Sequence, residues 1–259
     1  MLTLTDVSLS FHRYTGFVQQ SETQRLCNLN LTVMPGELIA IVGASGAGKS
    51  LLAHAILGLL PPNATLTGKI SFNGESLVGS YPKGLRGRKI ALMPQDIGHL
   101  DPLAKIGAQL RWASRRVGRL DKSSTALLEA VGLPAKVANA YPRELSGGMA
   151  RRVLIALSLV GNPDLIVADE PTAGLDPENS HRVLQRLRDH AREGRAAMVI
   201  THDLMTVLPF ADRVVILDDG KLTAIEQAGD FEGEGFNLRS LHARALWAAL
   251  PQNGFWSDA

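Results

Sequence analysis

The chain has 259 residues, of which 45% are hydrophobic and 20% charged, enough for one large domain or two small ones with a buried core. Its 27 lysines and arginines against 25 aspartates and glutamates leave a formal net charge of +2, which argues against a strongly electrostatic nucleic-acid binder. The single cysteine, Cys27, excludes an internal disulfide framework and a multi-cysteine metal site.

The N-terminal segments predict strands rather than a leader or a membrane span. Residues 2–11 alternate polar and apolar side chains, as a half-buried strand does. Residues 12–25 are polar and predict a loop, and residues 28–33 predict a second strand that ends at a Pro-Gly turn. The most apolar run, 51–60, is too short to cross a bilayer. We therefore expect a cytoplasmic protein.

A phosphate-binding loop is predicted after a third strand. Residues 37–42, ELIAIV, are typical of a strand buried on both faces, and the helical run 51–60 lies just downstream. The intervening residues fit the pattern G-x-x-x-x-G-K-[ST]. They are Gly43, Ala44, Ser45, Gly46, Ala47, Gly48, Lys49 and Ser50. Glycines let backbone amides converge on phosphate oxygens at the start of a helix, with Lys49 on the terminal phosphates and Ser50 on Mg²⁺.

Two adjacent acidic residues, Asp169 and Glu170, lie at the end of another apolar strand, 165–169. Asp169 is expected to hold Mg²⁺ through its water shell, and the adjacent Glu170 to polarise the attacking water. The alternative is a solvated acidic turn before Pro171. His202 follows the apolar run 197–201 and would lie at the ligand-facing edge of a parallel sheet, where it could bond the γ-phosphate. The alternative there is an ordinary surface histidine.

The remaining pattern is mixed α/β with a helical insertion at about 96–145. Apolar runs and turn signals predict further strands and helices. The strands are expected at 69–73, 89–94 and 213–217, and the helices within 98–132 and at 149–159, 179–192 and 238–250.

The motifs together resemble the ATP-binding subunit of ABC transporters, over nearly the whole chain. Residues 145–149, LSGGM, resemble the signature LSGGQ, with methionine in place of the last glutamine. Gln95 matches the Q-loop glutamine, residues 173–176 resemble the D-loop, and His202 matches the switch histidine. A phosphate loop alone does not choose among kinases, GTPases, motors and transport ATPases, whereas the signature and D-loop point to this family.

The resemblance implies an α/β P-loop NTPase fold with a RecA-like core, an N-terminal antiparallel β subdomain and a helical insertion. It implies a single ABC ATP-binding domain over residues 1–259, with a helical subdomain at about 96–160 and a C-terminal extension at about 229–259. It also implies a head-to-tail dimer in which each ATP lies between the phosphate loop of one subunit and the signature of the other.

The resemblance assigns a role to each candidate site residue. Glu170, His202 and Gln95 are the expected catalytic residues. Ser50, Gln95 and Asp169 are the expected Mg²⁺ ligands. Beyond the phosphate loop, the expected ATP contacts are Phe11, Ser146, Gly148, Met149 and Asp176. Phe11 is expected to stack on adenine, with Tyr14 and Phe17 as alternatives.

Within the family, residues 102–110, PLAKIGAQL, are similar to a segment of oligopeptide, dipeptide and nickel importer ATPases. The run 167–176, VADEPTAGLD, is similar to their D-type subunits. This implies a partner ATPase, either a different F-type chain or a second copy, and two integral membrane permease subunits. A periplasmic or surface solute-binding protein would act indirectly, and the chain would sit peripherally on the cytoplasmic face of the inner (plasma) membrane. Peptide-type members often carry a C-terminal cysteine cluster, and its absence favours nickel or a metal chelate over di- or oligopeptides.

Two other functions are weighed against an importer ATPase. A soluble ABC ATPase of DNA repair or translation usually has long coiled coils or two fused ATPase domains, and a small-molecule kinase has no use for the signature. The arginine-rich run 111–119 fits a solvated or permease-facing helix better than a nucleic-acid site. We therefore expect ATP hydrolysis coupled to import, with no nucleic-acid partner.

Overall fold

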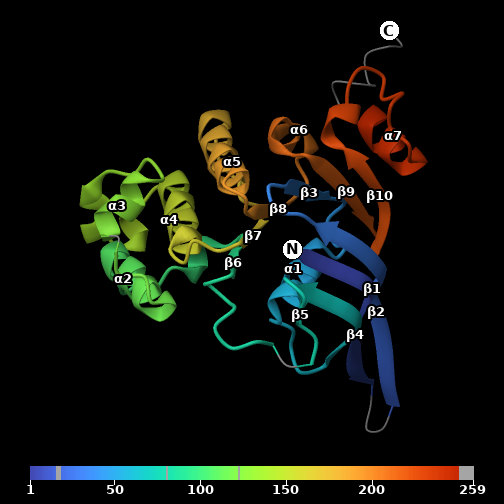
Figure 1. Cartoon of the computed structure of the whole chain (residues 1–259), viewed down its shortest axis with the longest axis horizontal. Helices are drawn as coiled ribbons and strands as arrows, with labels where there is room; N and C mark the ends of the chain where they lie inside the picture. The colour runs from blue at the N-terminus through green and yellow to red at the C-terminus, as the bar shows by residue number, and fades with distance from the viewer. Residues whose placement is uncertain (16–18, 80, 122, 251–259) are drawn as a thin grey trace. The chain divides into compact units, whose positions relative to one another are not determined.

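The computed structural model describes residues 1–15, 19–79, 81–121 and 123–250 (Figure 1). The chain forms two compact units, Met1–Tyr81 with Ile200–Ala259, and Pro82–Val199. Among the described residues, none of the helices combines the length and hydropathy that crossing a bilayer requires.

The first unit begins with an antiparallel sheet whose strand order is β2-β1-β4-β5. The strands are β1 (Leu2–Thr15), β2 (Gln19–Val33), β4 (Ala64–Phe72) and β5 (Glu75–Ser76). Leu2 in the first strand lies opposite both Val33 and Phe72, and all three side chains are buried.

The loop predicted at residues 12–25 is wrong for residues 12–15 and 19–25, because these residues belong to β1 and β2, which pair as antiparallel strands. His12 lies opposite Glu22, and Thr15 opposite Gln19. The polar composition suggested a loop, but backbone hydrogen bonds between antiparallel strands do not require apolar side chains. Paired polar strands therefore extend well beyond the alternating segment.

The same unit holds a second group of strands in the order β10-β9-β3. They are β3 (Leu38–Val42), β9 (Arg213–Asp218) and β10 (Lys221–Gln227). Strand β3 runs parallel to β9, whereas β10 returns antiparallel after a turn at Asp219-Gly220. All five residues of β3 are buried, as its continuous apolar run predicts.

The helices in the described part of this unit are α1 (Lys49–Leu57), α6 (Leu204–Val207) and α7 (Leu241–Ala248). Helix α1 ends earlier than the predicted 51–60 because Gly58 adopts a left-handed conformation and caps it. The described part of this unit also contains short 3₁₀ turns. These turns are η4 (Leu208–Phe210) and η5 (Ala228–Asp230).

The second unit contains the strands in the order β8-β7-β6. They are β6 (Ile90–Met93), β7 (Leu165–Asp169) and β8 (Ala196–Thr201), whose last two residues are assigned to the first unit. Strands β6 and β7 are parallel, with Met93 opposite Ala168, so the residues that follow both strands emerge at the same edge.

The helices of the second unit include the predicted insertion. They are α2 (Ile106–Val117), α3 (Ser124–Glu129), α4 (Gly147–Leu159) and α5 (Pro177–Arg192), with 3₁₀ turns η1 (Ile97–His99), η2 (Ala135–Asn139) and η3 (Pro142–Glu144). Helices α2, α3 and α4 lie next to one another (Figure 1). They share one apolar cluster that includes Ile106, Leu128 and Val153, each fully shielded from solvent. This cluster holds the start of α4 in place.

Candidate nucleotide-binding site

The phosphate loop, residues 43–50, joins the buried strand β3 to helix α1. A Cβ atom at Gly43 would lie 2.0 Å from the carbonyl oxygen of Leu217, and one at Gly48 would lie 2.6 Å from a methyl of Leu26. Gly48 also has a φ of +102° at the N-cap of α1. Glycine is therefore required at Gly43 by the backbone of Leu217 and favoured at Gly48 by its positive φ.

Lys49 lies over this loop. Its Nζ donates hydrogen bonds to the carbonyl oxygens of Gly43, at 2.7 Å, and Ala44, at 2.9 Å. The side chain is buried, whereas Ser50 beside it is exposed. An ammonium held at the N-terminus of a helix, inside a glycine loop, is chemically suited to phosphate oxygens.

The acid pair lies at the end of β7 in the second unit. Asp169 and Glu170 are both buried, with 7% and 8% of their surface exposed. Glu170 adopts a φ of +47°, the left-handed region that non-glycine residues seldom occupy. A buried carboxylate kept in a costly backbone conformation indicates a functional constraint.

Arg151, on α4, connects three of the predicted motifs of this unit. Its buried guanidinium donates hydrogen bonds to the carbonyl oxygens of Pro94, at 3.3 Å, and of Gln95, and to that of Ala173, at 3.3 Å. Burial lowers the pKa of Arg151, while the charges of Asp96 and Glu170 act in the opposite direction. The Q-loop backbone, the signature helix and the segment after the acid pair are therefore tied to one side chain.

Sequence reasoning did not identify Arg151. The available signal was an arginine within the apolar-periodic run 149–159, where a charged side chain on a buried face needs partners. The neighbouring sequence does not identify those partners, because Pro94, Gln95 and Ala173 lie 57, 56 and 22 residues away.

The signature residues form the N-terminus of α4. Ser146 is the N-cap, and its Oγ accepts a hydrogen bond from the backbone N–H of Met149 at 3.3 Å. Ser146 and Gly147 are exposed, so this end of the helix faces solvent. Met149 is half-buried and packs against the apolar cluster of the helical insertion. The structure thus gives Ser146 and Met149 structural roles, and their contact with ATP stays a prediction.

Asp176 and Gln95 also lie in the second unit. Asp176 is the N-cap of α5, where its carboxylate accepts hydrogen bonds from the backbone N–H and the side-chain amide of Asn179, at 2.8 and 2.6 Å. These two bonds lower the pKa of Asp176. Gln95 is exposed just after β6, and its carbonyl oxygen accepts a hydrogen bond from Arg151.

His202 and the candidate adenine-stacking residues belong to the first unit. His202 is exposed directly after β8. Phe11 is half-buried in β1, opposite Thr23. Tyr14 lies in the same strand with its side chain outside the described part, and Phe17 lies outside the described residues altogether.

The predicted Mg²⁺ ligands provide oxygen donors of the kind that this ion prefers, the hydroxyl of Ser50, the amide of Gln95 and the carboxylate of Asp169. Within the described ranges, no group of three or more histidine, cysteine, aspartate or glutamate side chains forms a metal cage. Mg²⁺ bound with nucleotides takes most of its ligands from phosphates and water, so the residues fit this ion.

Comparison with known proteins decides the family. Residues 26–173 match the family model described as ABC transporter. The chain belongs to the ABC transporter family. It is 34% identical to the oligopeptide transport ATP-binding protein OppD of Bacillus subtilis (strain 168), over 97% of this chain and 72% of that protein. It is 37% identical to OppD of Lactococcus lactis subsp. cremoris (strain SK11), over 100% and 78%. It is 35% identical to the dipeptide transport ATP-binding protein DppD of Bacillus subtilis (strain 168), over 87% and 70%.

Solved structures confirm the fold. The ATP-binding cassette MJ0796, in a dimeric post-hydrolysis state bound to ADP and Pi, superposes with a TM-score of 0.74 at 27% identity, over 88% of this chain and 99% of that one. An ATP-binding subunit of an ABC transporter superposes with a TM-score of 0.72 at 28% identity, over 95% and 98%. The predicted P-loop ABC ATPase fold is therefore confirmed, and the protein is an ABC-family ATPase.

Proposed function

We propose that this ABC ATPase binds Mg²⁺ and ATP and drives an importer of di- or oligopeptides. The observation that carries the proposal is its similarity, over 87–100% of its length, to three proteins named for oligopeptide or dipeptide transport. The sequence alone favoured nickel or a metal chelate because a cysteine cluster is lacking. The relatives described above are named for peptides, so they support the peptide alternative instead, and the soluble repair or translation alternative gains no support.

The residues of the site would divide the reaction between them. Lys49 and the amides of the phosphate loop hold the terminal phosphates, and Ser50, Asp169 and Gln95 supply oxygen ligands to Mg²⁺. The bound ion neutralises phosphate charge. Glu170 accepts a proton from the attacking water, and His202 bonds the γ-phosphate. The buried position and the left-handed backbone of Glu170 support its role as the base.

The ATPase would act as a head-to-tail dimer, in which Ser146, Gly148 and Met149 of one subunit approach the ATP held by the other. The exposed N-terminus of α4 supports this arrangement, since helix N-termini attract phosphate. Asp176 would lie at the same contact, and Phe11 would stack on the adenine. We propose that the two units form one ABC ATP-binding domain, with its helical subdomain at about 96–160 and a C-terminal extension at about 229–259.

The partners would be a second ABC ATPase, either an F-type chain or another copy, and two permease subunits at the cytoplasmic face of the inner membrane. A solute-binding protein would act indirectly, through the permeases. Capture of tagged protein from detergent-solubilised membranes should recover integral membrane subunits. Recovery of only soluble proteins would contradict the transport role.

The substrate is tested by uptake in a strain from which the gene is deleted. Cells complemented with the wild-type chain should accumulate a labelled tripeptide, and cells complemented with Glu170→Gln should not. Labelled Ni²⁺ in the same strains is the matched comparison. Restored nickel uptake without peptide uptake would favour the metal alternative and overturn the peptide proposal.

A further inference from the structure

A cavity of about 320 Å³ lies in the second unit between α4, α5 and the turn that follows α3. Its volume falls at the lower end of the range of small-molecule sites, roughly 300–1,000 Å³. Among the described lining residues, none belongs to the phosphate loop, the LSGGM signature or the acid pair. The proposed ATPase reaction therefore leaves this cavity unexplained.

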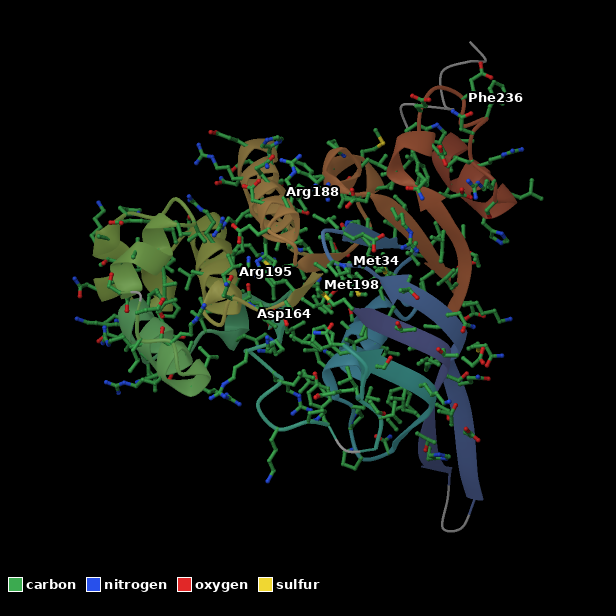
Figure 2. All side chains as sticks on the ribbon, viewed as in Figure 1. Met34, Asp164, Arg188, Arg195, Met198 and Phe236 are labelled. Carbon is green, nitrogen blue, oxygen red and sulfur yellow. The ribbon has the colours of Figure 1, made fainter. Side chains whose placement is uncertain are left out.

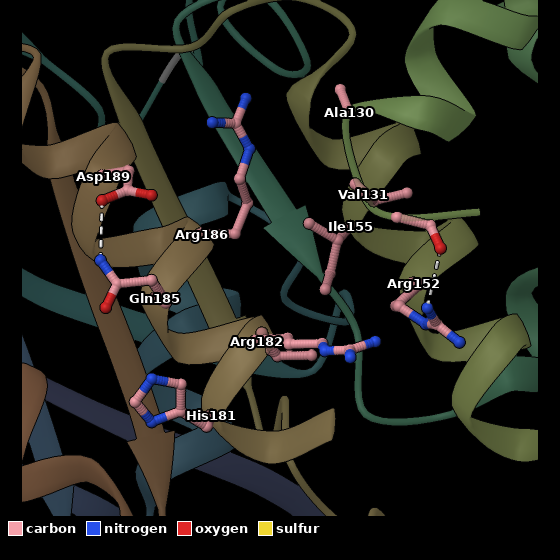
Figure 3. Close-up of a pocket in the computed structure, with 11 residues that line it drawn as sticks. Ala130, Val131, Arg152, Ile155, His181, Arg182, Gln185, Arg186 and Asp189 are labelled. Atoms are coloured by element: carbon pink, nitrogen blue, oxygen red, sulfur yellow. Dashed lines mark hydrogen bonds between the residues drawn. The ribbon is translucent and has the colours of Figure 1, made fainter. Parts of the chain in front are cut away.

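Apolar side chains form part of the cavity wall. Ile155 projects from α4 and Val183 from α5, and both are buried, while Ala130 and Val131 close the wall at the end of α3 (Figure 3). Such a surface favours an apolar body, because contact with it removes hydrocarbon from water.

The rest of the described lining is strongly cationic. Arg152 comes from α4, and Arg182 and Arg186 come from α5, against the carboxylate of Asp189 (Figure 3). That carboxylate already accepts a hydrogen bond from Gln185 at 2.8 Å and lies 4.0 Å from Arg192. The lining thus holds more positive charge than its own acid neutralises.

One of these guanidiniums is incompletely satisfied, whereas Arg152 already donates hydrogen bonds to the carbonyl oxygens of Gly148, at 3.3 Å, and Gly132, at 3.0 Å. The Nε atom of Arg186 is buried and makes no hydrogen bond to the described residues. Burial first, and then the positive charge of Arg182, lower the pKa of Arg152. The ion pair of Arg182 with Glu178 is largely exposed to solvent, so it offsets little of this repulsion. A buried donor without a partner is costly, and an oxyanion would supply the missing acceptors.

We propose that this cavity binds an amphipathic organic anion, with its apolar body against Ile155 and Val183 and its carboxylate, phosphate or sulfonate among the arginines. A guanidinium presents paired N–H groups that match the oxygens of such anions. The mixed lining selects a ligand with both features. An inorganic anion leaves the apolar wall in contact with water, and a neutral hydrocarbon leaves the buried Nε of Arg186 without an acceptor.

The test titrates the full chain with 1-anilinonaphthalene-8-sulfonate, an aromatic sulfonate whose fluorescence rises when it leaves water. We expect saturable binding of one molecule per chain. Arg182→Gln and Arg186→Gln should each weaken binding about tenfold, the typical cost of losing one charge-assisted hydrogen bond. Ala130→Phe should reduce binding as strongly, because it fills the cavity without removing a charge.

The matched control is Arg188→Gln, on the same helix but outside the cavity lining (Figure 2). It makes the same charge change and should bind the probe like the wild type. The neutral analogue N-phenyl-1-naphthylamine should bind more weakly than the sulfonate and respond little to the arginine substitutions. Circular dichroism and retained ATP affinity verify that each variant is folded.

Three results would overturn the proposal. The first is wild-type affinity for the sulfonate in folded Arg182→Gln, Arg186→Gln and Ala130→Phe proteins. The second is equal affinity for the neutral analogue, which would leave the arginines without a role. The third is that ATP displaces the probe and that Lys49→Ala no longer binds the probe. Together these observations would place the probe at the phosphate loop. Because the readout is probe binding, none of these results depends on whether the chain drives peptide import.

Discussion

The guanidinium of Arg151, on the signature helix, donates a hydrogen bond to the carbonyl oxygen of Ala173, in the segment after the acid pair, at 3.3 Å. The same side chain holds the carbonyls of Pro94 and Gln95. One buried cation thus ties the backbone after β6 to the segment that follows Glu170. The N–H groups of a guanidinium point in fixed, divergent directions, which suits several carbonyls at once.

Arg151→Met should lower the free energy of unfolding by about 2–3 kcal/mol, because it leaves buried carbonyl groups without donors. Arg151→Lys keeps the charge but not the planar geometry and should recover only part of the loss. Urea unfolding measures both. Arg111→Met, at an exposed position of α2, is the control and should change stability by less than about 0.5 kcal/mol. Equal stabilities for the variants at 151 and 111 would contradict the positioning role.

Glu170→Gln should lower kcat for ATP hydrolysis about a hundredfold to ten-thousandfold, as expected when a general base is lost. ATP affinity should remain, since the phosphate loop is intact. Steady-state hydrolysis and nucleotide titration of the subunit assembled with its partners measure the two effects. Glu129→Gln, at an exposed position of α3, should hydrolyse ATP normally. Undiminished turnover in Glu170→Gln would remove this residue from the reaction.

Lys49→Ala should weaken ATP binding by about tenfold or more, because it removes a cation from the phosphate loop. Isothermal titration with ATP in the presence of Mg²⁺ measures the affinity. Lys221→Ala removes an exposed lysine from the same unit and should bind ATP like the wild type. Normal affinity in Lys49→Ala would contradict the assignment of the loop.

Gly43→Ala should destabilise the protein by about 2 kcal/mol or more, since the added Cβ would meet the carbonyl oxygen of Leu217 at 2.0 Å and force the backbone to move. Gly229→Ala is the matched substitution, because a Cβ there meets none of the described atoms within 4 Å. Thermal unfolding compares the two. A Gly43→Ala protein as stable as Gly229→Ala would show that the loop tolerates a side chain.

Stability should fall in mild acid because of His190. Burial, reinforced by the nearby charge of Arg195, lowers the pKa of this histidine from 6.5 to about 4 in the folded chain. Between these values the unfolded chain binds a proton that the folded chain does not. The free energy of unfolding therefore decreases as the pH falls below 6.5, by about 1.4 kcal/mol per pH unit.

His190→Gln should remove about 2 kcal/mol of the stability loss between pH 7 and pH 5, as measured by urea unfolding at both values. His242→Gln, at an exposed position of α7, should leave the pH dependence unchanged. The same pH dependence in His190→Gln as in the wild type would mean that another group is responsible.

The sequence by itself determined the candidate site residues that form short contiguous patterns. The phosphate loop, the acid pair and the signature could be found because their chemistry requires particular residue types within a few positions of one another. The buried strands β3 and β7 were found for a similar reason, since continuous apolar runs mark strands covered on both faces.

Only the tertiary structure decided what depends on partners distant in the chain. The polar strand segments 12–15 and 19–25 form because each pairs with the other, and the sequence of neither segment identifies its partner. Arg151 and the arginines around Ile155 acquire their roles from helices and loops that folding brings to them. The burial of Arg151 and Glu170, the left-handed backbone of Glu170 and the unpaired Nε of Arg186 all result from tertiary packing. The same residue types in another fold would be exposed to water.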